Sequence, residues 1–96
     1  MAMRLYVGNL PDDVKDEDLI ALFGQAGTVQ SAEVVRQTTG QSAGYGFVEM
    51  ASDTEAEDAI RAFNGYMLDG NEIEVRVATP EGIGYPPSYG GLTSEG

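Results

Sequence analysis

The amino-acid sequence predicts an α+β fold of order βαββαβ, with a four-stranded antiparallel sheet and two helices covering one of its faces. Strand-like alternation of apolar and polar residues recurs along the chain, interrupted by segments in which apolar residues recur at helical spacing. Acidic residues stand at the start of both helical segments, where they suit the positive end of a helix dipole. Turns containing glycine complete the pattern. A chain of 96 residues is long enough for one such domain.

The first strand and the first helix occupy the opening of the chain. Met3 to Val7 alternates as a strand, and Asp12 or Asp13 is expected to cap the helix that follows. Glycines should close this helix, with Gly27 favoured over Gly24 as the residue in the left-handed conformation. The residues expected to face the core recur at helical spacing: Leu19, Leu22 and Phe23.

The second and third strands form a pair joined by a polar loop. Val29 to Arg36 is expected to be a strand, and the loop covers residues 37–43. Ala43 to Met50 then reads Ala-Gly-Tyr-Gly-Phe-Val-Glu-Met, in which Tyr45 and Phe47 stand two residues apart and project from one face. The residues expected to point to the opposite face are Gly46, Val48 and Met50.

A second helix and a fourth strand complete the domain. Ser52 or Asp53 should cap the helix, and an Asn-Gly turn at residues 64–65 should end it. Its core-facing residues are expected to be Ala56, Ala59, Ile60 and Phe63. Asn71 to Ala78 is expected to form the fourth strand. Its inward residues would be Ile73, Val75 and Val77, and its outward residues Glu74 and Arg76.

The composition changes after residue 79. Residues 80–96 are rich in Gly, Pro and Tyr, which predicts a flexible tail beside a folded domain of residues 1–79. Three roles stay open for this tail. In the first role, Tyr85 and Tyr89 add stacking to a bound strand. In the second, they fold back over the aromatic residues of the sheet. In the third, the tail is a linker within a longer protein.

Three aromatic residues are expected on the sheet face that the helices leave open. Tyr6 projects from the first strand on the side opposite Leu5 and Val7, and Tyr45 and Phe47 project from the third strand. Such rings form a flat platform on which bases can stack, and neighbouring glycines let a strand come close. Because aromatic residues are also common in strands for packing reasons, burial beneath another segment is the alternative.

Two short motifs in this chain resemble those of the RNA recognition motif family. Residues 44–48, Gly-Tyr-Gly-Phe-Val, match the longer motif of that family. The flanking positions depart from it, since Ala43 replaces a basic residue and Met50 replaces an aromatic one. Leu5 to Leu10 matches the shorter motif, and the resemblance covers roughly residues 3–79.

The resemblance implies a ferredoxin-like βαββαβ sandwich whose open sheet face binds single-stranded RNA. Bases would stack on Tyr6 and Phe47, and the ring of Tyr45 would pack against sugars between them. The implied role lies in RNA processing, stability or translation. Single-stranded DNA is the alternative ligand, because the stacking of bases on aromatic rings does not depend on the sugar.

Arginines near the open face are candidates for contacts with phosphates or bases. Arg4 lies in phase with the aromatic residue of the first strand, Arg76 belongs to the fourth strand, and Arg36 precedes the polar loop. The alternative is that these arginines pair with acidic residues on the same surface: Glu33, Glu49 and Glu74. Since family members commonly carry a basic residue at the Ala43 position, we expect weak binding with a shallow dependence on salt.

The net charge of −11 is unusual for a protein that binds nucleic acid, which normally presents a basic patch. Nine of the sixteen acidic residues fall near the starts of the two predicted helices, away from the open face. They are Asp12, Asp13, Asp16, Glu17, Asp18, Asp53, Glu55, Glu57 and Asp58. We expect capping and a solvated surface there, because the spacing does not match a calcium loop. The alternative function is a protein-interaction module that uses these helices or the sheet face.

The composition argues against an enzyme, a cofactor and a membrane span. The sequence has no cysteine and no histidine, which removes thiolate chemistry, the commonest metal ligand and the commonest general base. No phosphate-binding loop is present, and the glycines at 44 and 46 lack the third glycine of a dinucleotide fingerprint. Apolar runs are short, and the N-terminus leaves no space for a signal peptide. We expect a monomeric intracellular protein, cytoplasmic or nuclear, without cofactor or metal.

Overall fold

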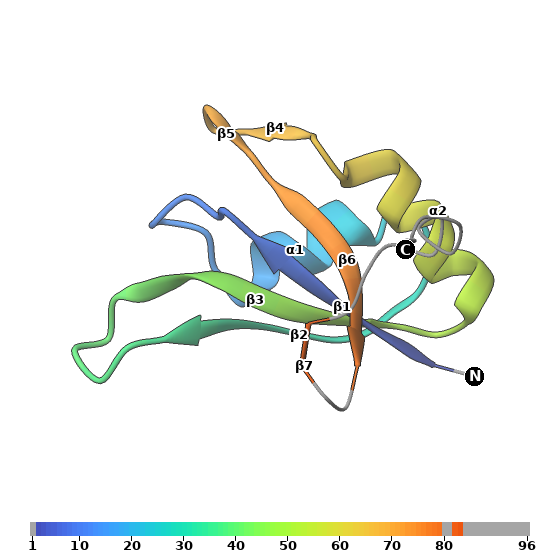
Figure 1. The fold of residues 1–96 in the computed structure, drawn as a ribbon, viewed down its shortest axis with the longest axis horizontal. Coiled ribbons are helices and arrows are strands. Elements are labelled where there is room, and N and C mark those ends of the chain that lie inside the picture. The colour runs from blue at the N-terminus through green and yellow to red at the C-terminus, as the bar shows by residue number, and fades with distance from the viewer. Residues whose placement is uncertain (1, 80–81, 84–96) are drawn as a thin grey trace, which may run out of the picture.

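The computed structural model describes residues 2–79 and 82–83 (Figure 1). Its elements are, in chain order, β1 (Met3–Gly8), α1 (Asp16–Phe23), β2 (Val29–Arg36), β3 (Ser42–Met50), α2 (Asp53–Phe63), β4 (Met67–Leu68), β5 (Asn71–Glu72), β6 (Glu74–Thr79) and β7 (Gly82–Ile83). The predicted order βαββαβ is confirmed by β1, α1, β2, β3, α2 and β6.

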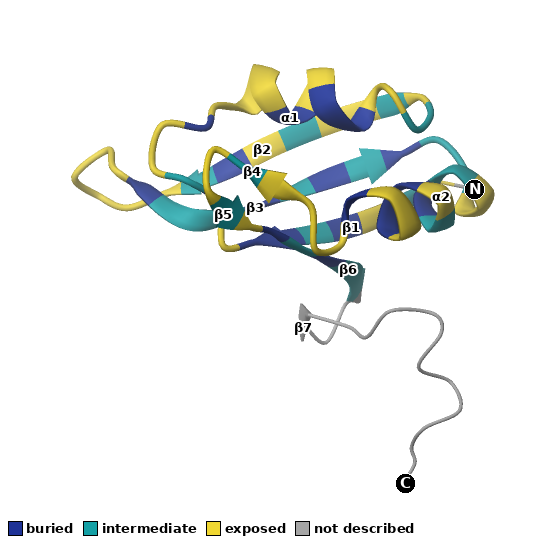
Figure 2. Cartoon of the chain, turned by 90° about the horizontal axis from the view of Figure 1, so that it is seen from above, coloured by how far each residue is buried: buried dark blue, intermediate teal, exposed yellow. Residues whose placement is uncertain are grey.

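The main sheet has the strand order β2-β3-β1-β6-β7, and all of its pairs are antiparallel. Both helices lie on one side of this sheet, and their buried residues point toward it (Figure 2). The predicted four-stranded antiparallel sheet is therefore confirmed, with β6 as its fourth strand, and β7 adds a fifth that pairs with the end of β6. The predicted flexible tail, with Tyr85 and Tyr89, otherwise lies outside the described residues.

The core lies between the sheet and the two helices. The strands contribute Leu5, Val7, Val34, Val48, Met50 and Val75, and the helices contribute Leu19, Leu22, Phe23, Ala56, Ala59, Ile60 and Phe63. Each of these residues is buried, and all of them except Val34 were predicted to face inward from their spacing. Within this core the rings of Phe23 and Phe63 join the two helices, with centroids 5.1 Å apart.

A glycine closes α1 as predicted, but the predicted N-cap and the predicted left-handed glycine are wrong. Its N-cap is Lys15, whose backbone N–H donates to the carboxylate of Asp18 at 2.9 Å, so neither Asp12 nor Asp13 caps the helix. The C-cap is Gly24 in a right-handed conformation with φ −61°, and Gly27 does not adopt a positive φ. The glycine at position 27 is explained by packing, because a Cβ there would lie 2.7 Å from the Cβ of Glu55.

The predicted fourth strand of residues 71–78 is interrupted at Ile73. Asn71–Glu72 pairs with Met67–Leu68 in a separate hairpin, and the sheet strand begins only at Glu74. Asp69 and Gly70 form the turn, with φ values of 49° and 90° that suit an Asp-Gly hairpin. Ile73 is 1% exposed, so the break occurs where the chain turns from the hairpin into the core. At α2, by contrast, Ser52 is the N-cap as predicted and accepts from the N–H of Glu55.

Candidate nucleic-acid interface

The open face of the sheet brings the three predicted aromatic side chains together. Tyr6 lies on β1, and Tyr45 and Phe47 lie on the neighbouring β3, where Tyr6 pairs with Phe47 in the register. The ring centroid of Tyr6 is 5.8 Å from that of Tyr45 and 6.1 Å from that of Phe47. All three side chains are half-buried. The face opposite the helices therefore presents a contiguous group of rings, called the aromatic platform below. It is not flat as predicted, because the ring plane of Phe47 is inclined by 65° to that of Tyr6 and by 89° to that of Tyr45.

Two glycines in the sheet explain how the platform is built. A Cβ at Gly8 would lie 2.5 Å from the hydroxyl oxygen of Tyr6, because the tyrosine ring lies along the strand over this glycine. A Cβ at Gly46 would lie 2.3 Å from the backbone carbonyl oxygen of Glu33, because β2 and β3 approach closely there. Gly8 thus accommodates a ring of the platform, and Gly46 allows the close pairing that supports it.

Two of the predicted arginines lie beside the rings. The guanidinium carbon of Arg4 is 4.4 Å from the ring centroid of Phe47, a distance typical of a cation–π contact. The guanidinium carbon of Arg76 is 5.9 Å from the ring centroid of Tyr6, and its side chain pairs with Glu74. The predicted alternative of ion pairing on the sheet surface is therefore confirmed for Arg76. In the described part of the chain Arg4 has no ion pair.

Arg36 lies apart from the platform. It ends β2, and its partner in the register is Ser42, three residues before Tyr45 along β3. A register shift between Val34 and Arg36 interrupts the pairing at this point. Arg36 lines a separate hollow together with Asp12, Gln37, Gly40, Gln41 and Ser42. The structure therefore brings Arg4 and Arg76 to the aromatic rings and leaves Arg36 near the loop that joins β2 to β3.

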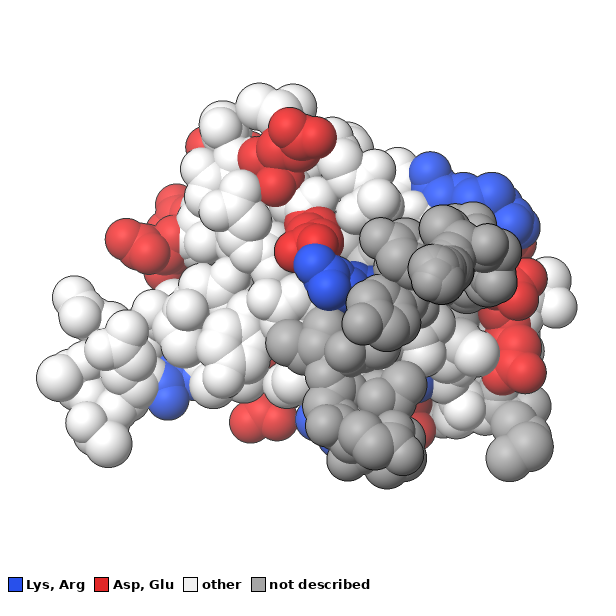
Figure 3. All heavy atoms as spheres, in the orientation of Figure 1, with Lys and Arg blue, Asp and Glu red and all other residues white. Residues whose placement is uncertain are grey.

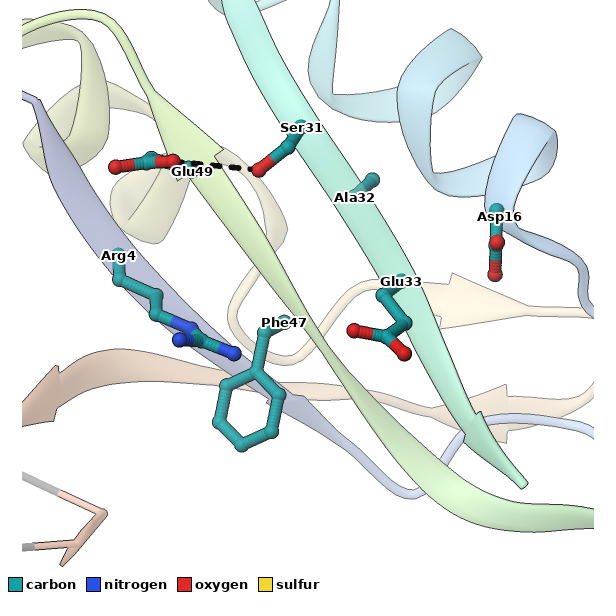
Figure 4. A pocket seen from close by; sticks show the side chains of 7 residues that line it. All are labelled: Arg4, Asp16, Ser31, Ala32, Glu33, Phe47 and Glu49. Atoms are coloured by element: carbon teal, nitrogen blue, oxygen red, sulfur yellow. Dashed lines mark hydrogen bonds between the residues drawn. The ribbon is translucent and has the colours of Figure 1, made fainter.

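A hollow of about 410 Å³ opens at the β2 side of the platform (Figure 4). Its lining residues are Arg4, Asp16, Ser31, Ala32, Glu33, Phe47 and Glu49. Sequence reasoning treated Glu33 and Glu49 only as partners of arginines and assigned Asp16 to the start of a helix. In the structure the hydroxyl of Ser31 donates to Glu49 at 3.3 Å, and the carboxylate of Asp16 accepts from the N–H of Val34 at 2.7 Å. Glu33 lies directly opposite Phe47.

The charges on the open face are mixed. In the view of Figure 3 the acidic and basic side chains of the described residues lie in small separate groups, and these residues form no broad basic region there. Most of the predicted helix-start acids do lie on α1 and α2, including Glu17 and Glu57. Within residues 2–79 and 82–83, no group of three or more potential metal ligands comes together, and neither helix is long or apolar enough to cross a membrane.

Comparisons with known proteins found a family model, related sequences and related structures. The family model for the RNA recognition motif matches residues 5–74. A 28 kDa chloroplastic ribonucleoprotein of Spinacia oleracea is 46% identical over 80 residues, which are 82% of this chain and 34% of that protein. The chain therefore spans about a third of the length of that relative.

Solved structures share the fold. The crystal structure of the RNA-binding protein PG1 superposes with a TM-score of 0.77 at 42% identity, covering 79% of this chain and 93% of that one. The protein of an Sxl-lethal protein–RNA complex superposes with a TM-score of 0.78 at 33% identity, covering 83% of this chain and 48% of that one. Both comparisons confirm the predicted ferredoxin-like architecture.

Proposed function

This chain belongs to the RNA recognition motif family, and on that premise we propose that residues 1–79 bind single-stranded RNA on the open face of the sheet. The observation that supports this proposal most directly is the platform of Tyr6, Tyr45 and Phe47, which lies opposite the helices. Single-stranded RNA offers unpaired bases that stack on such rings and expose their edges for hydrogen bonds. The name of the family and that of the Spinacia oleracea relative both describe proteins that bind RNA, and we propose no catalytic step for this chain.

In the proposed complex, one base stacks on Tyr6 and another on Phe47, while Tyr45 packs against the sugars between them. The guanidinium of Arg4 lies over one face of the Phe47 ring, 4.4 Å from the centroid, so a base that stacks on that face displaces it. The contact that is lost is worth about 0.5–1 kcal/mol at an exposed site, less than the roughly 1–3 kcal/mol of a base stack. Replacing the Arg4 contact by a stacked base is therefore favourable, and it leaves the guanidinium of Arg4 able to contact a phosphate.

We expect the affinity to depend only weakly on salt. The arginines proposed to meet phosphates or bases are Arg4, Arg36 and Arg76, and each neutralised phosphate on a single strand contributes about 0.7 to the slope of log K against log salt. The slope should therefore have a magnitude of about 2 or less, with a dissociation constant in the micromolar range or weaker. Fluorescence anisotropy with a labelled oligomer at several salt concentrations measures it, and a magnitude well above about 3 would contradict stacking-dominated binding.

The test of the proposed function is an amide chemical-shift titration of the full chain with short U-rich, G-rich and A-rich RNA at low salt. We expect the shifts to concentrate on Tyr6, Tyr45, Phe47 and Arg76. A DNA oligomer of matching sequence distinguishes RNA from single-stranded DNA as the preferred ligand. Shifts confined to α1 and α2, or no shifts at millimolar RNA, would reject the sheet as the binding surface and favour a protein partner for the acidic helices.

The cellular role of the domain is a wider proposal, because the chain spans only about a third of its chloroplast relative. The name ribonucleoprotein supports a role in RNA processing, stability or translation, acting as a monomeric module. The predicted cytoplasmic or nuclear location stays a prediction, and the relative named here is chloroplastic. The acidic helices are proposed as a secondary surface for a protein partner, whereas the sheet is assigned to RNA.

A further inference from the structure

A row of four side chains crosses the open face and has opposite charges at its two ends. Glu33 on β2 pairs with Phe47 on β3, Phe47 pairs with Tyr6 on β1, and Tyr6 pairs with Arg76 on β6. Directly opposed residues on one sheet face have Cβ atoms about 4.5–5.5 Å apart. A base stacked on Phe47 would therefore have a carboxylate within reach of its edge, and a base stacked on Tyr6 would have a guanidinium.

The carboxylate of Glu33 is available for such a contact. The side chain is exposed, and within the described part of the chain it has neither an ion pair nor a side-chain hydrogen bond. The other two carboxylates in the hollow already accept hydrogen bonds, Glu49 from the hydroxyl of Ser31 and Asp16 from the N–H of Val34. Figure 4 shows the Glu33 carboxylate on the β2 side of the Phe47 ring and the Arg4 guanidinium on the other side.

We propose that Glu33 selects guanine for the base that stacks on Phe47. This inference rests on the proposed RNA-binding function and adds a specificity-determining residue to it. An ionised carboxylate only accepts hydrogen bonds, through two oxygens. Guanine alone presents two adjacent donors on its Watson–Crick edge, N1–H and the N2 amino group, so both oxygens of Glu33 find a partner.

The other bases satisfy this carboxylate less well. Adenine and cytosine each present one amino group beside a ring nitrogen that accepts hydrogen bonds, so the second carboxylate oxygen would face another acceptor. Uracil presents a single N–H between two carbonyl oxygens. A well-formed bidentate contact discriminates against the wrong base by roughly five- to hundredfold, and we expect about tenfold at this solvent-exposed site.

The experiment measures the affinity of the full chain for heptamers UUUXUUU, in which X is G, A, C, U or inosine. Because a U-rich strand can slide along the sheet, the varied base can settle on whichever ring prefers it. We expect the G heptamer to bind about tenfold more tightly than the A, C or U heptamers. Inosine lacks the N2 amino group, so its heptamer should lose most of that advantage.

The variant Glu33→Gln should abolish the preference for G while the U heptamer binds as well as before or better, because a negative charge is removed. The matched control is Glu57→Gln on α2, which makes the same change in net charge on the opposite side of the sheet. This control should keep the preference for G. Isothermal titration calorimetry or anisotropy gives the ratios.

Three results would overturn the proposal while leaving RNA binding intact. They are equal affinity for all heptamers, a preference for another base in the unmodified chain, and a preference for G that survives in Glu33→Gln. If no heptamer binds and no amide of the sheet shifts, the proposed function itself fails, and the assignment of Glu33 fails with it.

Discussion

The double substitution Tyr6→Ala/Phe47→Ala is expected to lower the affinity for short single-stranded RNA about hundredfold. Each base–aromatic stack is worth roughly 1–3 kcal/mol by alanine substitution. The two rings are neighbours, with centroids 6.1 Å apart, so their contributions need not add fully. A combined loss near 3 kcal/mol corresponds to about a hundredfold change in the dissociation constant. Anisotropy or calorimetry with one oligomer and both proteins measures it.

The domain should remain folded in this double variant, because the two rings lie on the face opposite the core. Their neighbours along the same strands, Leu5, Val7 and Val48, are fully buried on the helical side and stay unchanged. The matched control is Tyr66→Ala, which removes an aromatic residue that is 41% exposed and lies outside the sheet. The control should bind RNA normally. An unchanged affinity in the double variant, with the amide spectrum preserved, would show that RNA does not stack on these rings.

Periodicity alone predicted the core-facing residues of the helices and of β3, but it missed Leu10 and Val14, which are buried between β1 and α1. Val48 and Met50 alternate with Tyr45 and Phe47 along one strand, and this spacing determines the face of each residue regardless of its partners. The same holds for the stripe that ends in Phe63 on α2. Local chemistry predicted the cap at Ser52 for a similar reason, since a hydroxyl that accepts from a nearby N–H needs no distant residue.

The pairing of strands could not be predicted in the same way. Glu33 stands opposite Phe47 because the two strands meet in one register out of several, and that register depends on packing across the whole sheet. The register shift near Arg36 is a further example. Arg36 ends β2, the strand beside β3, but the shift places this arginine opposite Ser42 and away from the rings. The specificity proposed for Glu33 therefore becomes visible only with the structure.

The start of α1 shows a second limit of sequence reasoning. Acidic residues cluster before and within the first turn, and each is chemically able to cap a helix. Asp18 accepts from the N–H of Lys15, while Asp16 accepts from Val34 on the neighbouring strand at 2.7 Å. A carboxylate that was assigned to the helix dipole thus also supports the strand that carries Glu33. Tertiary contacts decided between equivalent local candidates.

The substitution Phe23→Ala is expected to destabilise the domain by about 3–5 kcal/mol, the usual cost of removing a buried aromatic ring. Phe23 is fully buried, and its ring centroid is 5.1 Å from that of Phe63, so the cavity would open between the two helices. A domain of this size commonly has a stability of roughly 5–15 kcal/mol, so much of it would be lost. Urea unfolding followed by circular dichroism gives the free energy of unfolding.

The matched control is Ile20→Ala on the same helix, because Ile20 is 47% exposed and should cost less than about 1 kcal/mol. A loss below about 1 kcal/mol in Phe23→Ala would mean that the helix–helix contact does not support the fold.

RNA provides a second readout, since a ligand that binds only the folded state stabilises it by RT ln(1 + [L]/Kd). Phe23→Ala keeps the aromatic platform, so saturating RNA should raise its unfolding midpoint. Tyr6→Ala/Phe47→Ala should show little such shift, which separates loss of the fold from loss of the binding surface.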